Sequence, residues 1–168
     1  MSRCAVGIGS NLGDRLAHLT AAMRGLAAVG RVISVSSVYE TAPIGGPEQE
    51  SFLNAVAAID TAHTPHGLLR ELLAIERSRG RVREARWGPR TLDLDVILWD
   101  RQRISTPGLT VPHPRMAERR FVLKPLLEAW PDARTPEGSV IAAASEAVER
   151  QGLKRIEAKI GGPDWSPT

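Results

Sequence analysis

Two aspartates, Asp93 and Asp95, are the residues of this sequence best suited to do chemistry. They lie in WGPRTLDLDVILWD, residues 87–100, which otherwise has the pattern of a buried β-strand. Because side chains alternate along a strand, the two carboxylates project together from one face. The other face carries Leu92, Leu94, Val96 and Leu98. Asp is disfavoured in strands, and adjacent carboxylates both stay ionised easily only when a cation lies between them. The pair therefore predicts a divalent metal site.

Arginines are concentrated just before this strand. Six of them lie between positions 77 and 90: Arg77, Arg79, Arg81, Arg83, Arg86 and Arg90. Arginines near the end of a helix can simply complement its dipole on the surface, but six in this short stretch exceed that need. Guanidinium groups bind phosphate oxygens in pairs, and Mg²⁺ takes oxygen ligands that include phosphates. The sequence shows no Cys or His spacing typical of zinc. The segment thus favours a polyphosphate bound together with Mg²⁺.

The composition is that of one globular domain, and we expect residues 1–168 to form it. Of the 168 residues, 42% are apolar and 24% are charged, and the net charge of +3 gives little support to a nucleic-acid role. A single cysteine, Cys4, cannot form an internal disulfide and is expected to be buried in the first strand. Gly7 and Gly9 interrupt the only early apolar run, and no segment approaches the ~20 apolar residues that span a bilayer. We expect a cytoplasmic protein that binds a small anion.

The elements that position these residues follow the order βαββαβ. Apolar periodicity predicts strands over 3–8, 31–41, 52–61 and 91–99, and helices over 14–28 and 65–79. This is the split-βαβ pattern of ferredoxin-like folds, an α/β (α+β) class with a mostly antiparallel sheet flanked by helices. Beyond it we expect a helix that Pro125 opens and that ends at Ala129, a helix over 139–151, an edge strand over 153–160 and a flexible tail over 161–168.

The segment GIGSNLGDR resembles a nucleotide-binding loop but fails both known spacings. The dinucleotide fingerprint requires glycine at position 12, which is Leu12, and the phosphate-binding loop requires Lys where Asp14 follows Gly13. The favoured interpretation is a strand-to-helix turn in which Ser10 or Asn11 bonds to nearby backbone amides. A loop close to the ligand is the alternative.

Glu76 is unusual because it shares the apolar face of its helix with Leu72, near a helix C-terminus where negative charge is disfavoured. One interpretation is an ion pair with Arg79 or another arginine of the cluster. The other is a carboxylate that faces the ligand at the edge of the core. The residues alone leave both open.

Further downstream, LTVPHPRMAERRFVL supplies His113 between two prolines, with arginines nearby. An isolated histidine is usually structural, but a phosphate or ribose contact is the alternative. Phe52 and Phe121 are the only phenylalanines, and either one taken alone would be interpreted as a core residue.

Four segments carry a further signal when they are taken together: GIGSNLGDR, VSSVYETAPIGGPEQESFLNAV, GRVREARWGPRTLDLDVIL and LTVPHPRMAERRFVLKPLLE. In this order they resemble the 6-hydroxymethyl-7,8-dihydropterin pyrophosphokinases of folate biosynthesis. The resemblance implies transfer of the pyrophosphoryl group of ATP to the pterin hydroxymethyl group, with release of AMP. It also implies a ferredoxin-like α/β sandwich that is usually monomeric and acts on small molecules, not on nucleic acid or membrane.

The resemblance also implies a role for each matching residue. Asp93 and Asp95 are expected to bind two Mg²⁺ ions, and Asp95 also to orient or deprotonate the attacking hydroxyl. The expected catalytic residues are Arg81, Arg90 and Asp95. The expected ATP contacts are Glu76, Arg83, Trp87, Arg90, His113 and Arg119. The expected pterin contacts are Thr41, Ile44, Phe52, Asn54 and Phe121. Pro114 replaces an aromatic residue found in some members, and the chain after about residue 152 matches little.

Two other classes are compatible with parts of the pattern. A small RNA-binding module can use a ferredoxin-like sheet and arginine loops, but the aromatic pattern of such modules on adjacent central strands is absent from the sequence. A phosphotransferase or nucleotidyltransferase with a different acceptor would share the metal and phosphate features. The released product, AMP against ADP or pyrophosphate, separates these enzymes.

Overall fold

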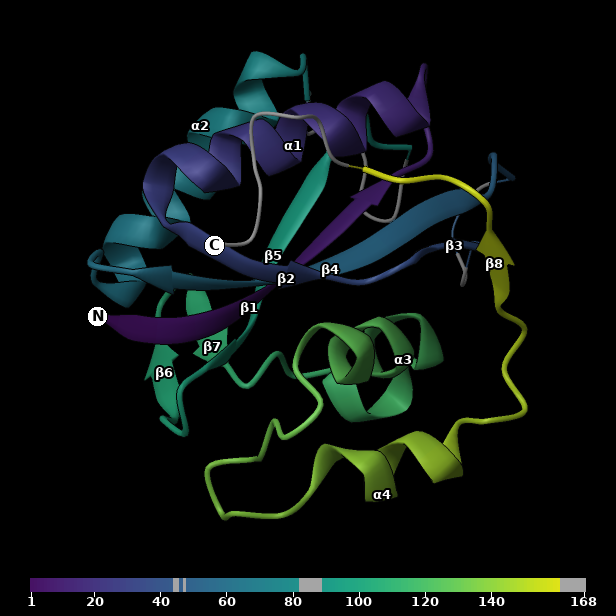
Figure 1. The fold of residues 1–168 in the computed structure, drawn as a ribbon. Helices are drawn as coiled ribbons and strands as arrows, with labels where there is room; N and C mark the ends of the chain where they lie inside the picture. Colours follow the sequence, from purple (N-terminus) through teal and green to yellow (C-terminus); the bar gives the residue numbers. More distant parts are fainter. Residues whose placement is uncertain (44–45, 47, 82–88, 161–168) are drawn as a thin grey trace.

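The centre of the protein is a six-stranded antiparallel sheet (Figure 1). The computed structural model describes residues 1–43, 46, 48–81 and 89–160. The strands are β1 (Ser2–Ser10), β2 (Arg31–Val35), β3 (Val38–Thr41), β4 (Phe52–Thr61), β5 (Asp93–Trp99) and β8 (Lys154–Ile156). Their order is β5-β1-β4-β3-β8, and β2 also pairs with β4. The long central strands β1 and β4 thus connect the edge strand β5, which carries both aspartates, to the rest of the sheet.

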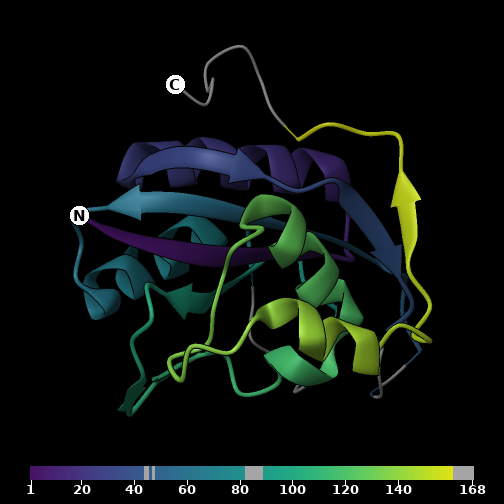
Figure 2. The ribbon, with the colours of Figure 1, turned by 60° about the horizontal axis from the view of Figure 1, so that its bottom comes forward.

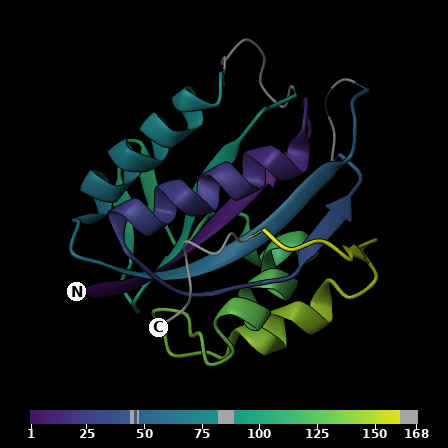
Figure 3. The same ribbon diagram turned by 45° about the horizontal axis from the view of Figure 1, so that its top comes forward.

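Helices cover both faces of the sheet. The first pair, α1 (Arg15–Val29) and α2 (Pro65–Ser78), lies side by side on one face (Figure 3). The second pair, α3 (Arg120–Ala129) and α4 (Ile141–Ala147), lies on the other face (Figure 2). A hairpin of β6 (Ile104–Thr106) and β7 (Leu109–Val111) and a short 3-10 helix, η1 (Met116–Glu118), link β5 to α3. The site-bearing part of the chain therefore crosses from one face to the other after β5.

The predicted βαββαβ order is confirmed, and with it the ferredoxin-like class. Its second strand is broken into β2 and β3 at Ser36, which forms two bonds to Val56 of β4. The Ser36 amide donates to the Val56 carbonyl at 2.9 Å, and the Val56 amide donates to Ser36 Oγ at 2.9 Å. Both parts of the strand therefore stay paired with β4. Thr64 caps α2, since its side chain accepts a hydrogen bond from the Gly67 amide at 3.0 Å.

The apolar core forms two clusters, one on each face of the sheet. The larger lies under α1 and α2 and includes Ile8, Leu94 and Val96, whereas the smaller lies under α3 and α4. The prediction that Leu98 shares a face with Leu94 and Val96 is wrong. Val6 pairs with Val96 but Ala5 pairs with Leu98, so Ile97 is an extra residue in β5. This bulge reverses the alternation and places Leu98 in the α3 cluster.

The last third departs most from the sequence-based expectations. The prediction that Pro125 opens a helix is wrong, because α3 already begins at Arg120 and holds Pro125 in its interior. Burial of Leu123, Leu126 and Ala129 against the sheet offsets the hydrogen bond that proline cannot make. The helix predicted over 139–151 is shorter, Ile141–Ala147, and the edge strand predicted over 153–160 is confirmed only as Lys154–Ile156.

Three further expectations concern the chain as a whole. Burial of Cys4 is confirmed. Over the ranges that the structure describes, no helix combines the length and apolar character needed to cross a membrane. The extent of the domain, 1–168, stays a prediction, and the tail over 161–168 lies outside the described residues.

Candidate active site

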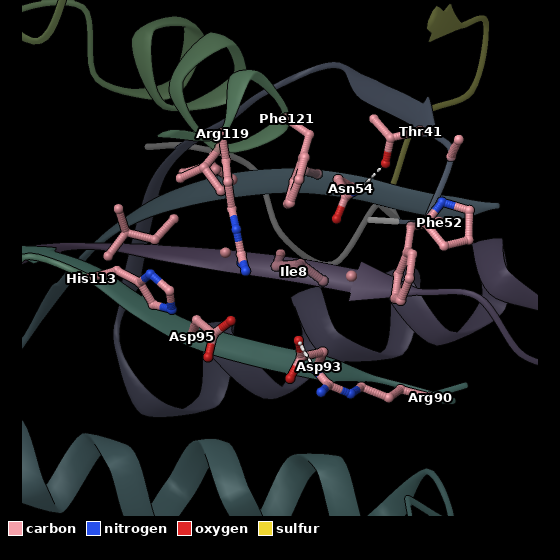
Figure 4. A pocket seen from close by; sticks show the side chains of 18 of the residues that line it. Ile8, Thr41, Phe52, Asn54, Arg90, Asp93, Asp95, His113, Arg119 and Phe121 are labelled. Atoms are coloured by element: carbon pink, nitrogen blue, oxygen red, sulfur yellow. Dashed lines mark hydrogen bonds and ion pairs between the residues drawn. The ribbon is translucent and has the colours of Figure 1, made fainter. Parts of the chain in front are cut away.

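A pocket opens on the α3 face of the sheet, above β1, β4 and β5 (Figure 4). Four segments far apart in the sequence form its walls: the end of β3, the segment that leads into β5 at Arg90, the turn after β7 and the start of α3. Nine of the predicted site residues line it: Thr41, Phe52, Asn54, Arg90, Asp93, Asp95, His113, Arg119 and Phe121. The fold thus brings the residues predicted for two different ligands to one place.

Asp93 and Asp95 project from the same face of β5 into this pocket, as their spacing predicted (Figure 4). Their environments differ. Arg81 Nη1 donates to Asp93 Oδ1 at 2.7 Å, and Arg90 Nη1 donates to Asp93 Oδ2 at 2.8 Å. Within the described ranges, Asp95 forms no such hydrogen bond or ion pair. Asp93 is therefore neutralised by two cations, whereas Asp95 is not.

This difference shows in the acidity of Asp95. Burial raises the pKa of Asp95 from 3.8 to about 7, and the negative charges of Asp93 and Glu76 add to the effect. The positive charges of Arg90 and Arg81 only partly oppose it. A half-buried carboxylate whose negative charge is only partly balanced is a place where a bound cation would lower the free energy.

Glu76 and Arg81 support this pair from the side and do not line the pocket. Glu76 is 3% exposed, accepts the Leu94 amide at 2.8 Å and forms an ion pair with Arg81 at 2.5 Å. Arg81 bridges Glu76 to Asp93 and also donates to the Leu92 carbonyl at 3.3 Å. The ion-pair interpretation of Glu76 is confirmed, with Arg81 in place of Arg79. Direct contact of Glu76 or Arg81 with a nucleotide stays a prediction.

His113 and Arg119 lie on the same side of the pocket as Asp95 (Figure 4). The Arg115 amide donates to His113 Nδ1 at 3.2 Å, so the neutral ring carries its proton on Nε2. Burial lowers the pKa of His113, as do the positive charges of Arg119 and Arg115, although Asp93 opposes them. The histidine is thus a neutral hydrogen-bond donor, and Arg119 supplies a cation beside it.

The opposite side of the pocket holds the two phenylalanines. Figure 4 shows the rings of Phe52 and Phe121 with Asn54 between them. Asn54 Nδ2 donates to Thr41 Oγ1 at 2.8 Å, which orients the amide. The guanidinium carbon of Arg119 lies 5.4 Å from the Phe121 ring centroid. Both rings are only partly buried, so they form the walls of a slot and not part of the core.

Two glycines for which the sequence predicted no functional role form the floor of the pocket. A Cβ atom at Gly7 would lie 3.0 Å from Ile97 Cδ1, and one at Gly9 would lie 3.1 Å from Asn54 Oδ1. In the sheet Gly7 pairs with Asp95, and Gly9 pairs with Asp93. The period of two shared by these glycines and the aspartates was the signal that could have identified them. Gln49 and Pro43 also line the pocket and had no comparable signal.

Three predicted site residues, Ile44, Arg83 and Trp87, lie outside the described residues. In the part of the chain that the structure describes, no group of three or more His, Cys, Asp or Glu side chains could hold a metal ion. Any metal at Asp93 and Asp95 would therefore draw further ligands from water or substrate, which is the usual behaviour of Mg²⁺.

Fold and pocket together define a class: a small α+β protein in which one pocket holds paired carboxylates and arginines next to two aromatic rings. The chain belongs to the family described as 7,8-dihydro-6-hydroxymethylpterin-pyrophosphokinase, whose model matches residues 5–131. It is 45% identical to a 2-amino-4-hydroxy-6-hydroxymethyldihydropteridine pyrophosphokinase of Methylorubrum extorquens, over 94% of this chain and 100% of that protein. It is 51% identical to the Bacillus subtilis protein of the same description, over 93% of this chain and 91% of that protein.

The fold also matches solved structures of longer proteins. One is a crystal structure of HPPK-DHPS in complex with substrates, with a TM-score of 0.66 and 14% identity. The match covers 87% of this chain but only 43% of that one. At this identity the likeness supports the fold, an α+β sandwich with a mostly antiparallel sheet.

Proposed function

We propose that this pocket binds ATP with two Mg²⁺ ions on its charged side and 6-hydroxymethyl-7,8-dihydropterin between its two phenylalanines. As a member of its family, the protein is a pyrophosphokinase of folate biosynthesis that acts on hydroxymethyldihydropterin. The proposed donor is ATP, and the proposed second product is AMP. The observation that carries this assignment is one pocket lined both by Asp93 and Asp95 and by Phe52 and Phe121.

The acidic side fits Mg²⁺. Asp95 is half-buried in the pocket wall and lacks a cationic partner among the described residues, and desolvation raises its pKa to about 7. Hard oxygen ligands on neighbouring strand positions suit a hard cation that keeps its remaining sites for phosphate and water. Asp93 and Asp95 would hold the ions, which when bound would neutralise charge on the phosphates and on the incoming hydroxyl.

The cationic side chains are placed to bind the phosphate groups. Arg90 lies in the pocket beside Asp93, His113 presents Nε2–H, and Arg119 adds a second guanidinium. Phosphoryl transfer depends mostly on positioning and on fixed charge that acts as the bond to the leaving phosphate breaks. We propose that Arg90 exchanges part of its bond to Asp93 for a phosphate oxygen. Arg81 would orient Asp93, and its contact with the transferred phosphates remains an expectation from the family.

The aromatic side fits a pterin. Two facing rings offer stacking area for a flat heterocycle, and Asn54, held by Thr41, offers its Oδ1 to the polar edge of that heterocycle. A ring without the matching donors would leave this partly enclosed oxygen unpaired, which gives discrimination. Asp95 would then accept the hydrogen bond of the attacking hydroxyl. Roles for Ile44, Glu76, Arg83 and Trp87 remain expectations from the family.

The test is the product formed from ATP. The purified protein, supplied with ATP, Mg²⁺ and 6-hydroxymethyl-7,8-dihydropterin, should release AMP, and omission of the pterin or chelation of the metal should abolish release. Release of ADP or pyrophosphate instead would indicate a different phosphotransferase. Steeply salt-dependent RNA binding without metal, and no AMP release, would favour an RNA-binding module. We also propose a cytoplasmic monomer, and sedimentation analysis tests its monomeric state.

A further inference from the structure

Asn11 is a fully buried polar residue that the proposed mechanism does not use. It follows β1, is 1% exposed and does not line the pocket. Its backbone and side chain form four hydrogen bonds. Two join it to Arg90: the Asn11 amide donates to the Arg90 carbonyl at 3.0 Å, and the Arg90 amide donates to Asn11 Oδ1 at 2.8 Å. The other two run from Asn11 Nδ2 to Gln49 Oε1 at 2.8 Å and to the Glu50 carbonyl at 3.0 Å.

Three of these bonds are made by the side chain, and together they require asparagine. One end of the group must accept from a backbone N–H, and the other must donate to a backbone carbonyl, which can only accept. Aspartate retains the acceptor but loses the donor. Alanine loses both and leaves the Arg90 amide and the Glu50 carbonyl without this partner. Because the group is buried, each lost partner carries the cost of an unmade hydrogen bond.

The partners of Asn11 belong to the two different sides of the pocket. Arg90 lies on the charged side, next to Asp93. Gln49 lines the pocket, and Glu50 lies two positions before the ring of Phe52, which forms a wall of the aromatic slot. The side chain of Asn11 therefore bridges two segments by direct hydrogen bonds: the segment at Arg90, proposed to bind phosphate, and the segment 49–50 beside the aromatic slot.

We propose that Asn11 is a positioning residue that couples nucleotide binding to pterin binding. A ligand that fixes Arg90 also fixes Asn11, and Asn11 in turn holds the 49–50 segment beside the ring slot. The second ligand then meets a site that is already ordered, so each ligand raises the affinity for the other by the same factor. This inference rests on the proposed function, because it requires that both ligands bind.

Calorimetry on the full chain measures this factor directly. The affinity for the pterin is determined alone and in the presence of Mg²⁺ with an ATP analogue whose α,β-bridging oxygen is replaced by methylene, so that transfer cannot occur. We expect the analogue to strengthen pterin binding by about 5-fold or more in the natural protein, the lower range of measured couplings. In Asn11→Ala the factor should fall close to one. Asn11→Asp, which keeps the acceptor for Arg90, should retain nucleotide binding and also lose the coupling.

Arg15 provides the matched control. It joins the start of α1 to the same loop, with Nη1 donating to the Ser51 carbonyl at 2.9 Å and to Glu40 at 3.0 Å, and it forms no bond to Arg90. Arg15→Ala should therefore keep the coupling factor. Equal loss of coupling in Arg15→Ala, or a factor near one in the natural protein, would overturn the role of Asn11. Failure of the natural protein to bind either ligand would instead overturn the proposed function.

Discussion

The two faces of the sheet use the same strands for opposite purposes. Toward α1 and α2, β5 directs Leu94 and Val96 into a closely packed apolar core. Toward α3, the intervening residues of β5 are Asp93 and Asp95, and β1 contributes glycines there. Adjacent positions along one strand thus differ completely in environment, because the side-chain period is two.

This contrast shows how the core on one face of the sheet stabilises a pocket on the other face whose own residues contribute little packing. Two neighbouring carboxylates and a glycine floor contribute little packing, and Asp95 is destabilised by its own burial. The opposite face supplies the stabilisation through fully buried side chains such as Leu72 and Leu19. Substitutions on the site face should therefore mainly change catalysis, and those on the core face should mainly change stability.

The largest effect is expected on the site face. Asp95→Ala removes a proposed metal ligand and the proposed acceptor for the attacking hydroxyl, so kcat should fall by on the order of 10³ or more. Steady-state kinetics measures the loss, and circular dichroism should show an unchanged fold. Near-normal turnover would contradict the assignment of the site to this face.

Leu72→Ala tests the core face. This side chain of α2 is fully buried in the larger cluster, and its truncation should lower the free energy of unfolding by about 2–5 kcal/mol through lost transfer energy and a cavity. Urea denaturation measures that loss. At temperatures where the variant stays folded, kcat should be close to that of the natural protein. A large loss of kcat would contradict the expectation that core-face substitutions mainly change stability.

Phe121→Ala sharpens the comparison within the pocket itself. Loss of one wall of the aromatic slot should weaken pterin binding by about 1–3 kcal/mol, the range measured for stacking of a base on an aromatic side chain. Calorimetry with the pterin provides the value, and Phe121→Tyr, which retains the ring, is the control. Nucleotide binding should change much less, and an equal loss of both would argue against a separate ring site.

Asp95→Asn, unlike Leu72→Ala, is expected to stabilise the metal-free protein. In metal-free protein the pKa of Asp95 is raised from 3.8 to about 7, so between these values the folded state holds more protons than the unfolded chain. The contribution of Asp95 to stability is therefore favourable at low pH and is lost as the pH rises toward 7. The amide should raise the stability of the metal-free protein by about 1–3 kcal/mol at pH 8 and by little near pH 4.

Thermal unfolding in the presence of a chelator, at several pH values, measures this effect. Added Mg²⁺ should stabilise the natural protein and not the Asp95→Asn variant. A variant that is less stable than the natural protein at pH 8 would indicate that Asp95 has a stabilising partner.

Much of the fold was predictable because the apolar periodicity of each element agrees with its final place. The paired aspartates were also predictable as a site, since two charges on an apolar strand have few stable arrangements without a cation. The roles of Phe52 and Phe121 came only from the family resemblance, because a single phenylalanine is more often a core residue. The structure places both rings in the pocket.

What could not be predicted depends on tertiary contacts. The extra residue at Ile97 in β5 leaves no mark on the sequence pattern but reverses the direction of Leu98. Pro125 is an ordinary signal for the start of a helix, and only the packing of α3 on the sheet places it inside one. Asn11 lies 79 positions from Arg90, so its hydrogen bonds could not be inferred from local turn preferences.

The position of β5 at the edge of the sheet has a consequence for self-association. An edge strand normally exposes unpaired amides and carbonyls to which another polypeptide can add. Here the Glu76 carboxylate accepts from the Leu94 amide, Arg81 donates to the Leu92 carbonyl and the His113 amide donates to the Ile97 carbonyl. Glu76 and Arg81, which hold Asp93 in place, therefore also help to protect the edge against aggregation by strand addition.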